Sequence, residues 1–456
     1  MCILQSKGYN QSPRRFIYFG CLLGFILFLG ILQPCFAANL LAVYQDALKN
    51  DTVYQAAVST RLSMREALPQ SVAALLPSIK GQANLSSNYQ NITQAPPDTP
   101  LGVSQFPSRG YSVSITQPLF DMGDWLAVKQ ATNTSKQADA TLGAAAQALI
   151  YRVANAYFQV LLAQDNLRLA QSEKTANAKQ LYQAQKRVRV GLDAVTSVYD
   201  AKAAYDKSLA AEITAQNALR NSQEGIRQLT GQIYSDLNGF KNKLPLLPPQ
   251  PTNIEQWINS ATAYNLNLMA SRYGMEAARD NIKVKASGHL PTLNLIGSYG
   301  RDNGIDVGTT DRNSAVVGLQ LDVPLFSGGA ISSNTRKAEY DFQTASANLD
   351  NTYRQVMVTT RQKYNDVLAD ISTIKAEYQA VESAQLSLDS TEESFKAGTR
   401  TIIDVLLAQQ NLYDAKRNVA KDQYTYLLDS LALKQEAGTL KPDDLAQINQ
   451  WLIRVC

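Results

Sequence analysis

The amino-acid sequence predicts an all-α coiled-coil tunnel joined to a transmembrane β-barrel that several chains share. Four short segments alternate apolar and polar residues, and two long segments without proline have the composition of helices. Both patterns occur twice, at an offset near 207 positions, which is also the separation of Gly191 and Gly398. The chain is therefore interpreted as a tandem duplication of one strand-and-helix unit.

The N-terminus has the layout of a secretory signal peptide, residues 1–37. Three basic residues precede an apolar run over 16–32, and the small residues Cys35 and Ala37 follow at the expected cleavage site. A retained membrane anchor is the alternative, because an apolar run of this length is near the lower limit for a spanning helix.

Removal of the signal peptide changes what charge and cysteine content imply. The net charge falls from +4 to +1, so the basic isoelectric point does not indicate a nucleic-acid partner. Cys456 is the one cysteine left in the mature sequence, so no disulfide is expected within the chain.

Alternation with a period of two residues predicts four strands, at 76–89, 111–123, 290–300 and 316–329. In the last of these, Val317, Leu319 and Leu321 alternate with polar or small residues. Such segments are typical of transmembrane barrel strands, although a half-buried soluble sheet gives the same alternation. A bacterial membrane barrel needs about eight strands or more, so four strands per chain predict a shared barrel.

The strands are expected to form two outer-membrane hairpins, 76–120 and 290–326. The polar, turn-rich segments 91–110 and 301–314 are predicted to be their loops on the outer face of the membrane.

Two stretches, 119–244 and 325–441, contain no proline and are rich in Ala, Gln, Leu and Lys. They predict two long coiled-coil hairpins, 121–231 and 327–438. At 1.5 Å per residue, each outgoing arm is long enough for about 100 Å of helix and each returning arm for about 60 Å.

The remaining segments are expected to complete the shorter, returning side of each hairpin. They are two helical segments, Leu40 to Leu68 within 38–75 and Thr252 to Ser287 within 252–289, and two belt segments, 232–251 and 439–456.

An apolar residue recurs every seven positions along both returning arms, which is typical of coiled-coil packing. The stripe is narrower than a helix packed on a globular core would need. Its members are Val405, Leu412, Val419, Tyr426 and Leu433 in the second arm, and Val198, Tyr205, Leu219 and Ile226 in the first, where Glu212 interrupts it.

Four motifs carry a resemblance to a known family: NLLAVYQDAL (39–48), QPLFDMGDW (117–125), GHLPTLNL (288–295) and AGTRTIIDVL (397–406). The chain resembles the TolC family, the outer-membrane exit ducts of Gram-negative efflux pumps and type I secretion systems. The resemblance implies a homotrimer in which each chain gives four strands to a twelve-stranded barrel, continued by a helical tunnel across the periplasm. It also implies partners: a periplasmic adaptor protein and an inner-membrane efflux or ABC transporter.

The resemblance places the tunnel entrance at the end of the second hairpin. Asp404 matches an acid near that entrance, and threefold symmetry would make it a ring that favours cations. Other members place a second acid where this chain has Leu407, so weaker cation selectivity and weaker block by divalent ions are expected.

The family also closes its entrance with a latch between the two hairpins. Arg400 matches the latch arginine, but Phe395 stands where a tyrosine is expected and Ser197 where an acid is expected. Asp193 or Asp404 would have to serve as the acceptor instead.

The two hairpin turns are predicted to form the surface on which the adaptor docks. Gly191 and Gly398 permit the left-handed backbone that ends a helix, and Leu192 and Thr399 follow them. Ordinary turns with solvated side chains are the alternative interpretation.

No catalytic pattern is present, because His289 is the one histidine and the mature chain keeps a single cysteine. We therefore expect no enzyme activity, metal or cofactor. Two rival classes stay open: a trimeric coiled-coil surface adhesin and a periplasmic scaffold.

Overall fold

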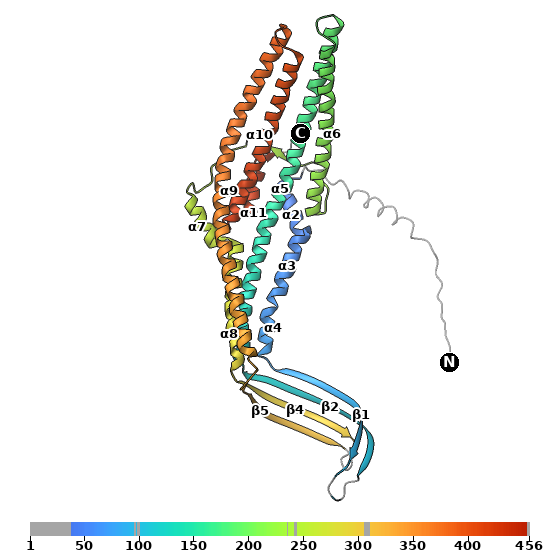
Figure 1. The fold of residues 1–456 in the computed structure, drawn as a ribbon, viewed down its shortest axis with the longest axis vertical. Helices are drawn as coiled ribbons and strands as arrows, with labels where there is room; N and C mark the ends of the chain where they lie inside the picture. The colour runs from blue at the N-terminus through green and yellow to red at the C-terminus, as the bar shows by residue number, and fades with distance from the viewer. Residues whose placement is uncertain are drawn as a thin grey trace, which may run out of the picture.

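The structure is a computed structural model, and it describes residues 38–94, 97, 101–234, 236–240, 244–304 and 311–453. The predicted signal peptide and Cys456 lie outside the described residues. The protein is elongated, with a four-stranded sheet at one end and the turns of two long helical hairpins at the other (Figure 1).

The sheet combines the two strand pairs in the order β1-β2-β4-β5, all antiparallel. The strands are β1 (Ser78–Ile92), β2 (Gly102–Phe120), β4 (Thr292–Gly304) and β5 (Arg312–Asp322). The contact between β2 and β4 joins the two halves of the duplication, with Val113 opposite Tyr299.

All four predicted strands are present, but their predicted bounds need correction. Residues 102–110 were expected to be loop and instead extend β2, where Ser108 pairs with Ser86 of β1. The polar residues at 102–110 have the composition of a loop, but they pair with a stretch of β1 that is also polar. At the other end β5 stops at Asp322, because Pro324 cannot donate to a ladder.

The apolar face of the sheet is not covered by any of the described residues. Leu85 and Val317 are each 82% exposed, and Ile79 is 69% exposed. A continuous apolar face of this kind marks a surface that meets lipid or another chain. Among the described helices, none is both long and apolar enough to cross a membrane.

Two helices run the whole length between the sheet and the far turns: α5 (Met122–Arg189) and α9 (Ala330–Lys396) (Figure 1). They have 68 and 67 residues, or about 100 Å each. The returning helices are α6 (Thr196–Thr230) and α10 (Ile402–Glu436), with 35 residues each.

Shorter helices complete the returning sides, as expected, but they are interrupted. They are α2 (Leu40–Asn50), α3 (Thr52–Arg65), α4 (Ala67–Ala74), α7 (Ile254–Tyr264), α8 (Leu266–Ala286) and the 3₁₀ turn η1 (Ser287–His289).

Both predicted helical segments are present, and buried polar caps separate α2 from α3 and α7 from α8. Asp51 accepts a hydrogen bond from the Tyr54 backbone N–H and pairs with Arg152 of α5 at 2.8 Å. Asn265 accepts from the Leu268 backbone N–H and donates to the Glu436 carbonyl at 2.9 Å. Each cap starts a new helix and joins it to another helix, Asp51 to α5 and Asn265 to α10.

The main core lies at mid-length, where the belt segments pack on the long helices. There β3 (Gly239–Phe240) pairs with β6 (Leu452–Ile453), next to α11 (Pro442–Asn449). Phe158 of α5 stacks on Phe240 and Tyr424, with ring centroids 6.5 and 5.9 Å away. This cluster joins both halves of the chain around α5 and α10.

The seven-residue stripe is buried or half-buried along both returning helices. Val405, Leu412 and Leu433 are fully buried in α10. Glu212, the interruption in α6, is also buried, and it pairs with Lys174 of α5 at 2.5 Å. An ion pair thus takes the place of an apolar contact at that position.

Candidate functional site: the hairpin turns and the contacts between the hairpins

Both far turns end a long helix in the same way. Gly191 has φ +74° and Gly398 has φ +81°, the left-handed region that glycine adopts without strain. The Leu192 backbone N–H donates to the Arg187 carbonyl at 2.9 Å, and the Thr399 N–H donates to the Ser394 carbonyl at 3.0 Å. These long turn bonds are those of a Schellman motif.

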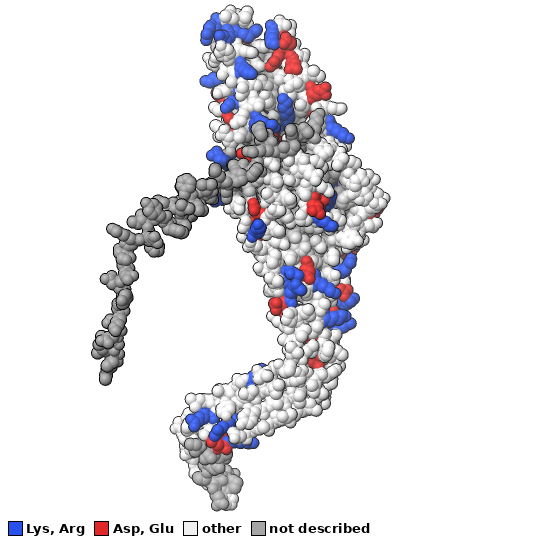
Figure 2. All heavy atoms as spheres, turned by 180° about the vertical axis from the view of Figure 1, so that it is seen from behind, with Lys and Arg blue, Asp and Glu red and all other residues white. Residues whose placement is uncertain are grey.

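The two turns are exposed at the end of the molecule farthest from the sheet (Figure 1). Leu192 is 66% exposed although it is apolar. The last turn of α5 carries Lys186, Arg187 and Arg189, and basic side chains gather at this end in the space-filling view (Figure 2). The first turn therefore combines an exposed apolar residue, Leu192, with basic side chains from the end of α5.

Asp404 and Arg400 contact each other within the second hairpin. Their shortest ion-pair distance is 3.7 Å, and Arg400 is 61% exposed. Asp404 also closes a capping box at the start of α10, accepting from the Thr401 backbone N–H at 2.9 Å and from its hydroxyl at 2.8 Å. These hydrogen bonds, with the Arg400 charge, lower the pKa of Asp404 below its ordinary value.

Phe395 and Ser197 do not join that pair. Phe395 is 7% exposed, and its ring lies 4.7 Å from the Arg187 guanidinium of the first hairpin. Arg187 in turn donates to Asp193 at 2.7 Å. Ser197 is half-buried and makes no side-chain hydrogen bond with the described residues. The four residues predicted for the gate are thus spread over separate contacts in the single chain.

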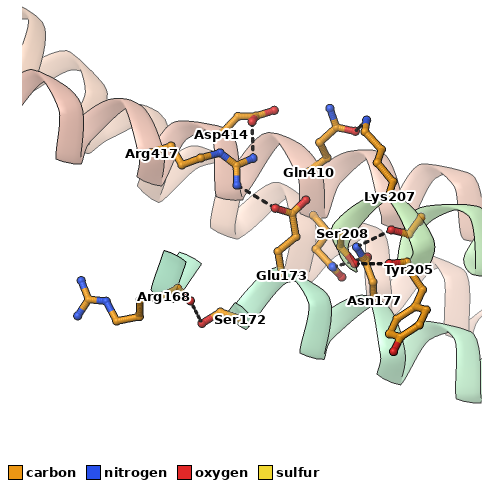
Figure 3. Close-up of polar contacts among 12 residues, drawn as sticks. Arg168, Ser172, Glu173, Asn177, Tyr205, Lys207, Ser208, Gln410, Asp414 and Arg417 are labelled. Atoms are coloured by element: carbon orange, nitrogen blue, oxygen red, sulfur yellow. Dashed lines mark hydrogen bonds and ion pairs between the residues drawn. The ribbon is translucent and has the colours of Figure 1, made fainter. Parts of the chain in front are cut away.

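Polar contacts between the hairpins, which the sequence did not predict, lie further along the same helices (Figure 3). Arg417 of α10 donates to Glu173 of α5 at 2.8 Å, and Lys207 of α6 donates to Gln410 at 3.4 Å. Two further contacts are Gln409 to Asn177 at 2.8 Å and Gln180 to Glu392 at 3.2 Å.

No sequence pattern marks these residues, because Gln, Asn, Lys and Glu also cover solvated helix faces. The informative feature is burial: Asn177, Gln180 and Gln409 are at most 7% exposed. Polar side chains in such a position are hydrogen-bonded to a partner. They therefore fix how the two hairpins lie against each other.

Two hollows flank these contacts. One of about 910 Å³ is lined by α5, α9 and α10, including Lys179, Lys186 and Phe395. The other, about 760 Å³, is lined by α5, α6 and α10, and Leu407 lies on its wall at 56% exposure. Across the described ranges, no group of three His, Cys, Asp or Glu side chains is placed to hold a metal ion.

Comparisons with known proteins agree with this arrangement. Residues 43–232 and 257–439 match the family described as "Outer membrane efflux protein". Outer membrane protein TolC of Vibrio cholerae serotype O1 is 39% identical over 421 residues, which cover 91% of this chain and 94% of that protein. Proteases secretion protein PrtF of Dickeya chrysanthemi is 29% identical over 427 residues, 91% of each.

The fold is also that of a solved channel. The Campylobacter jejuni CmeC outer membrane channel superposes with a TM-score of 0.76 at 18% identity, covering 91% of this chain and 89% of that one. The predicted fold class is thereby confirmed: mostly helical, with a four-stranded sheet in each chain.

Long paired hairpins joined to an open sheet with an apolar face define a channel protein of the outer membrane. The chain belongs to the outer membrane efflux protein family, whose members are structural channel proteins of Gram-negative bacteria rather than a class of enzymes.

Proposed function

We propose that three copies of this chain form an exit duct for efflux and type I secretion. The observation that carries the proposal is the open sheet, in which β1 and β5 are edge strands and the apolar face is uncovered. Four strands cannot close a bacterial membrane barrel, whereas three copies supply twelve. The names of the TolC and PrtF relatives, an outer membrane protein and a protease secretion protein, support the duct.

The far turns are the proposed contact with a periplasmic adaptor protein and an inner-membrane efflux or ABC transporter. Gly191, Leu192, Gly398 and Thr399 are all exposed there, and Leu192 is 66% exposed although it is apolar. An exposed apolar residue inside a basic rim suits a partner surface that is apolar at its centre and acidic at its edge.

The entrance of the duct lies between the hairpins of the three copies, where Asp404 forms one ring of acids. A carboxylate at this position is charged at neutral pH, and the Thr401 hydrogen bonds lower its pKa further, so the ring favours cations. Leu407 one turn further on adds no second ring. Contacts between the hairpins, such as Arg417 with Glu173, hold the entrance narrow until a partner docks.

Conductance of the purified mature protein in a planar bilayer tests this proposal. Small, cation-selective steps are expected, with selectivity reduced by Asp404→Asn. Asp389→Asn is the matched control, because Asp389 is an exposed acid on α9 away from the turn. Magnesium should block only weakly, since there is one acid ring. Inserted trimers that pass no current would overturn the duct in favour of an adhesin or scaffold.

A further inference from the structure

Arg187 is the residue through which the first turn and the second hairpin meet. Its side chain donates from Nε to Asp193 Oδ2 at 2.7 Å, and its guanidinium lies 4.7 Å from the Phe395 ring centre. Its own carbonyl accepts from the Leu192 backbone N–H at 2.9 Å. Arg187 thus makes two contacts with the α5–α6 turn and one contact with α9.

We propose that Arg187 couples the exposed α5–α6 turn to the second hairpin, so that displacing Leu192 and Asp193 releases Phe395 and loosens the entrance. The proposal rests on the gated duct proposed above and assigns the residue that transmits docking to the gate.

The geometry makes the contacts of Arg187 depend on one another. The guanidinium is planar and donates in fixed directions, so the bond to Asp193 sets the plane in which it lies. A cation interacts with a ring face only within about 6 Å. Moving Asp193 with the turn therefore rotates the guanidinium away from Phe395.

Both side-chain partners of Arg187 lie at a turn, Asp193 at the first and Phe395 at the second, so the contact connects the two turns. The Phe395 carbonyl accepts from the Gly398 N–H at 3.1 Å, so the ring belongs to the end of α9. Side-chain exposure is 27% for Arg187 and 17% for Asp193. Burial of this degree strengthens charged contacts relative to fully solvated ones.

Arg400, which the family resemblance assigns to the latch, makes its contacts within the second hairpin. Its ion-pair partner, Asp404, lies on the same hairpin at 3.7 Å. Among the described residues, no polar contact joins Arg400 to α5 or α6. A residue whose contacts stay within one hairpin cannot hold two hairpins together in the single chain.

The test is a double-mutant cycle read by bilayer conductance. Arg187→Gln and Phe395→Leu should each raise the open fraction by roughly tenfold, and the double variant should raise it no further. Arg187→Lys keeps the charge but not the planar stack, so its effect should be intermediate. Arg220→Gln is the matched control, because Arg220 is an exposed cation on α6 away from the turn.

The outcomes separate the two proposals. Wild-type protein that conducts, with Arg187→Gln indistinguishable from Arg220→Gln, would overturn the coupling and leave the duct standing. Effects of Arg187→Gln and Phe395→Leu that simply multiply would also overturn it. Trimers that never conduct, in any variant, would overturn the duct itself. Native electrophoresis and the thermal midpoint of each variant show whether it is folded and trimeric, and Arg187→Lys keeps the test decisive should Arg187→Gln not assemble.

Discussion

Arg417 on α10 and Glu173 on α5 form an ion pair of 2.8 Å that joins the second hairpin to the first. Glu173 is 13% exposed and Arg417 30% exposed, and Arg417 also pairs with Asp414 of its own helix. The pair lies next to Gln409 and Asn177, so it belongs to a short row of polar contacts between the hairpins.

Breaking this pair should loosen the contact between the hairpins. Arg417→Gln with Glu173→Gln, analysed as a double-mutant cycle, should give a coupling of about 1 kcal/mol, since the pair is only partly solvated. The measurement is hydrogen exchange along α5 and α10 in the trimer. Arg168→Gln is the control, because Arg168 pairs with Asp165 within α5; an equal effect there would contradict the assignment.

Stability should depend on pH through Asp370. Its Oδ2 atom is buried. Desolvation first, and then the charges of Asp429, Asp366 and Asp422, raise its pKa from 3.8 to about 7. Lys363 is bonded to Asp429 and Asp366 instead.

Because the folded pKa lies above the unfolded one, the folded state binds the proton more tightly. The contribution to stability is complete below about pH 4, the unfolded pKa, and is lost as pH rises through about 7. The thermal midpoint should therefore fall between pH 6 and pH 8, and Asp370→Asn should flatten that fall. Asp389→Asn should leave it unchanged. A midpoint that rises over this interval would refute the assignment.

Replacing either of two glycines at equivalent helix ends with alanine should destabilise the protein by different amounts. Gly438 has φ +70°, and a Cβ there would lie 2.1 Å from the Tyr264 carbonyl oxygen. Gly231 has φ +71° but open space around it. Gly231→Ala should cost about 1 kcal/mol from backbone strain, and Gly438→Ala more than about 3 kcal/mol, measured by denaturant unfolding. Equal costs would show that the Tyr264 contact does not matter.

The start of α10 should depend on its capping box. Thr401→Ala removes the hydroxyl that accepts from the Asp404 N–H and donates to its carboxylate. The start of α10 should lose about 1 kcal/mol of local stability, which should appear as faster hydrogen exchange at residues 402–405. Thr399→Ala is the control, since its hydroxyl bonds to Ser394 at the end of α9; if both variants exchange alike, the cap is not the cause.

The elements of the fold could be predicted from the sequence because their patterns are local. Alternation located the four strands, and the stretches without proline located α5 and α9. The breaks at Asp51 and Asn265 could not be predicted, because each cap depends on a partner far along the chain, Arg152 or Glu436.

The candidate site was predictable only in part, for a related reason. The turns at Gly191 and Gly398 follow from glycine itself. The contacts of Arg187 and Arg417 depend on how one hairpin is rotated against the other, which no spacing in the sequence encodes. The resemblance placed Phe395 at the tyrosine position of a latch with Arg400, whereas in the single chain its ring faces Arg187.

The most direct test of the account is the number of chains that share the barrel. Native mass spectrometry of the mature protein extracted from outer membranes should give three times the mass of one chain. A dimer would contradict the account, because it would supply eight strands instead of twelve, and a monomer would contradict it because four strands leave the barrel open.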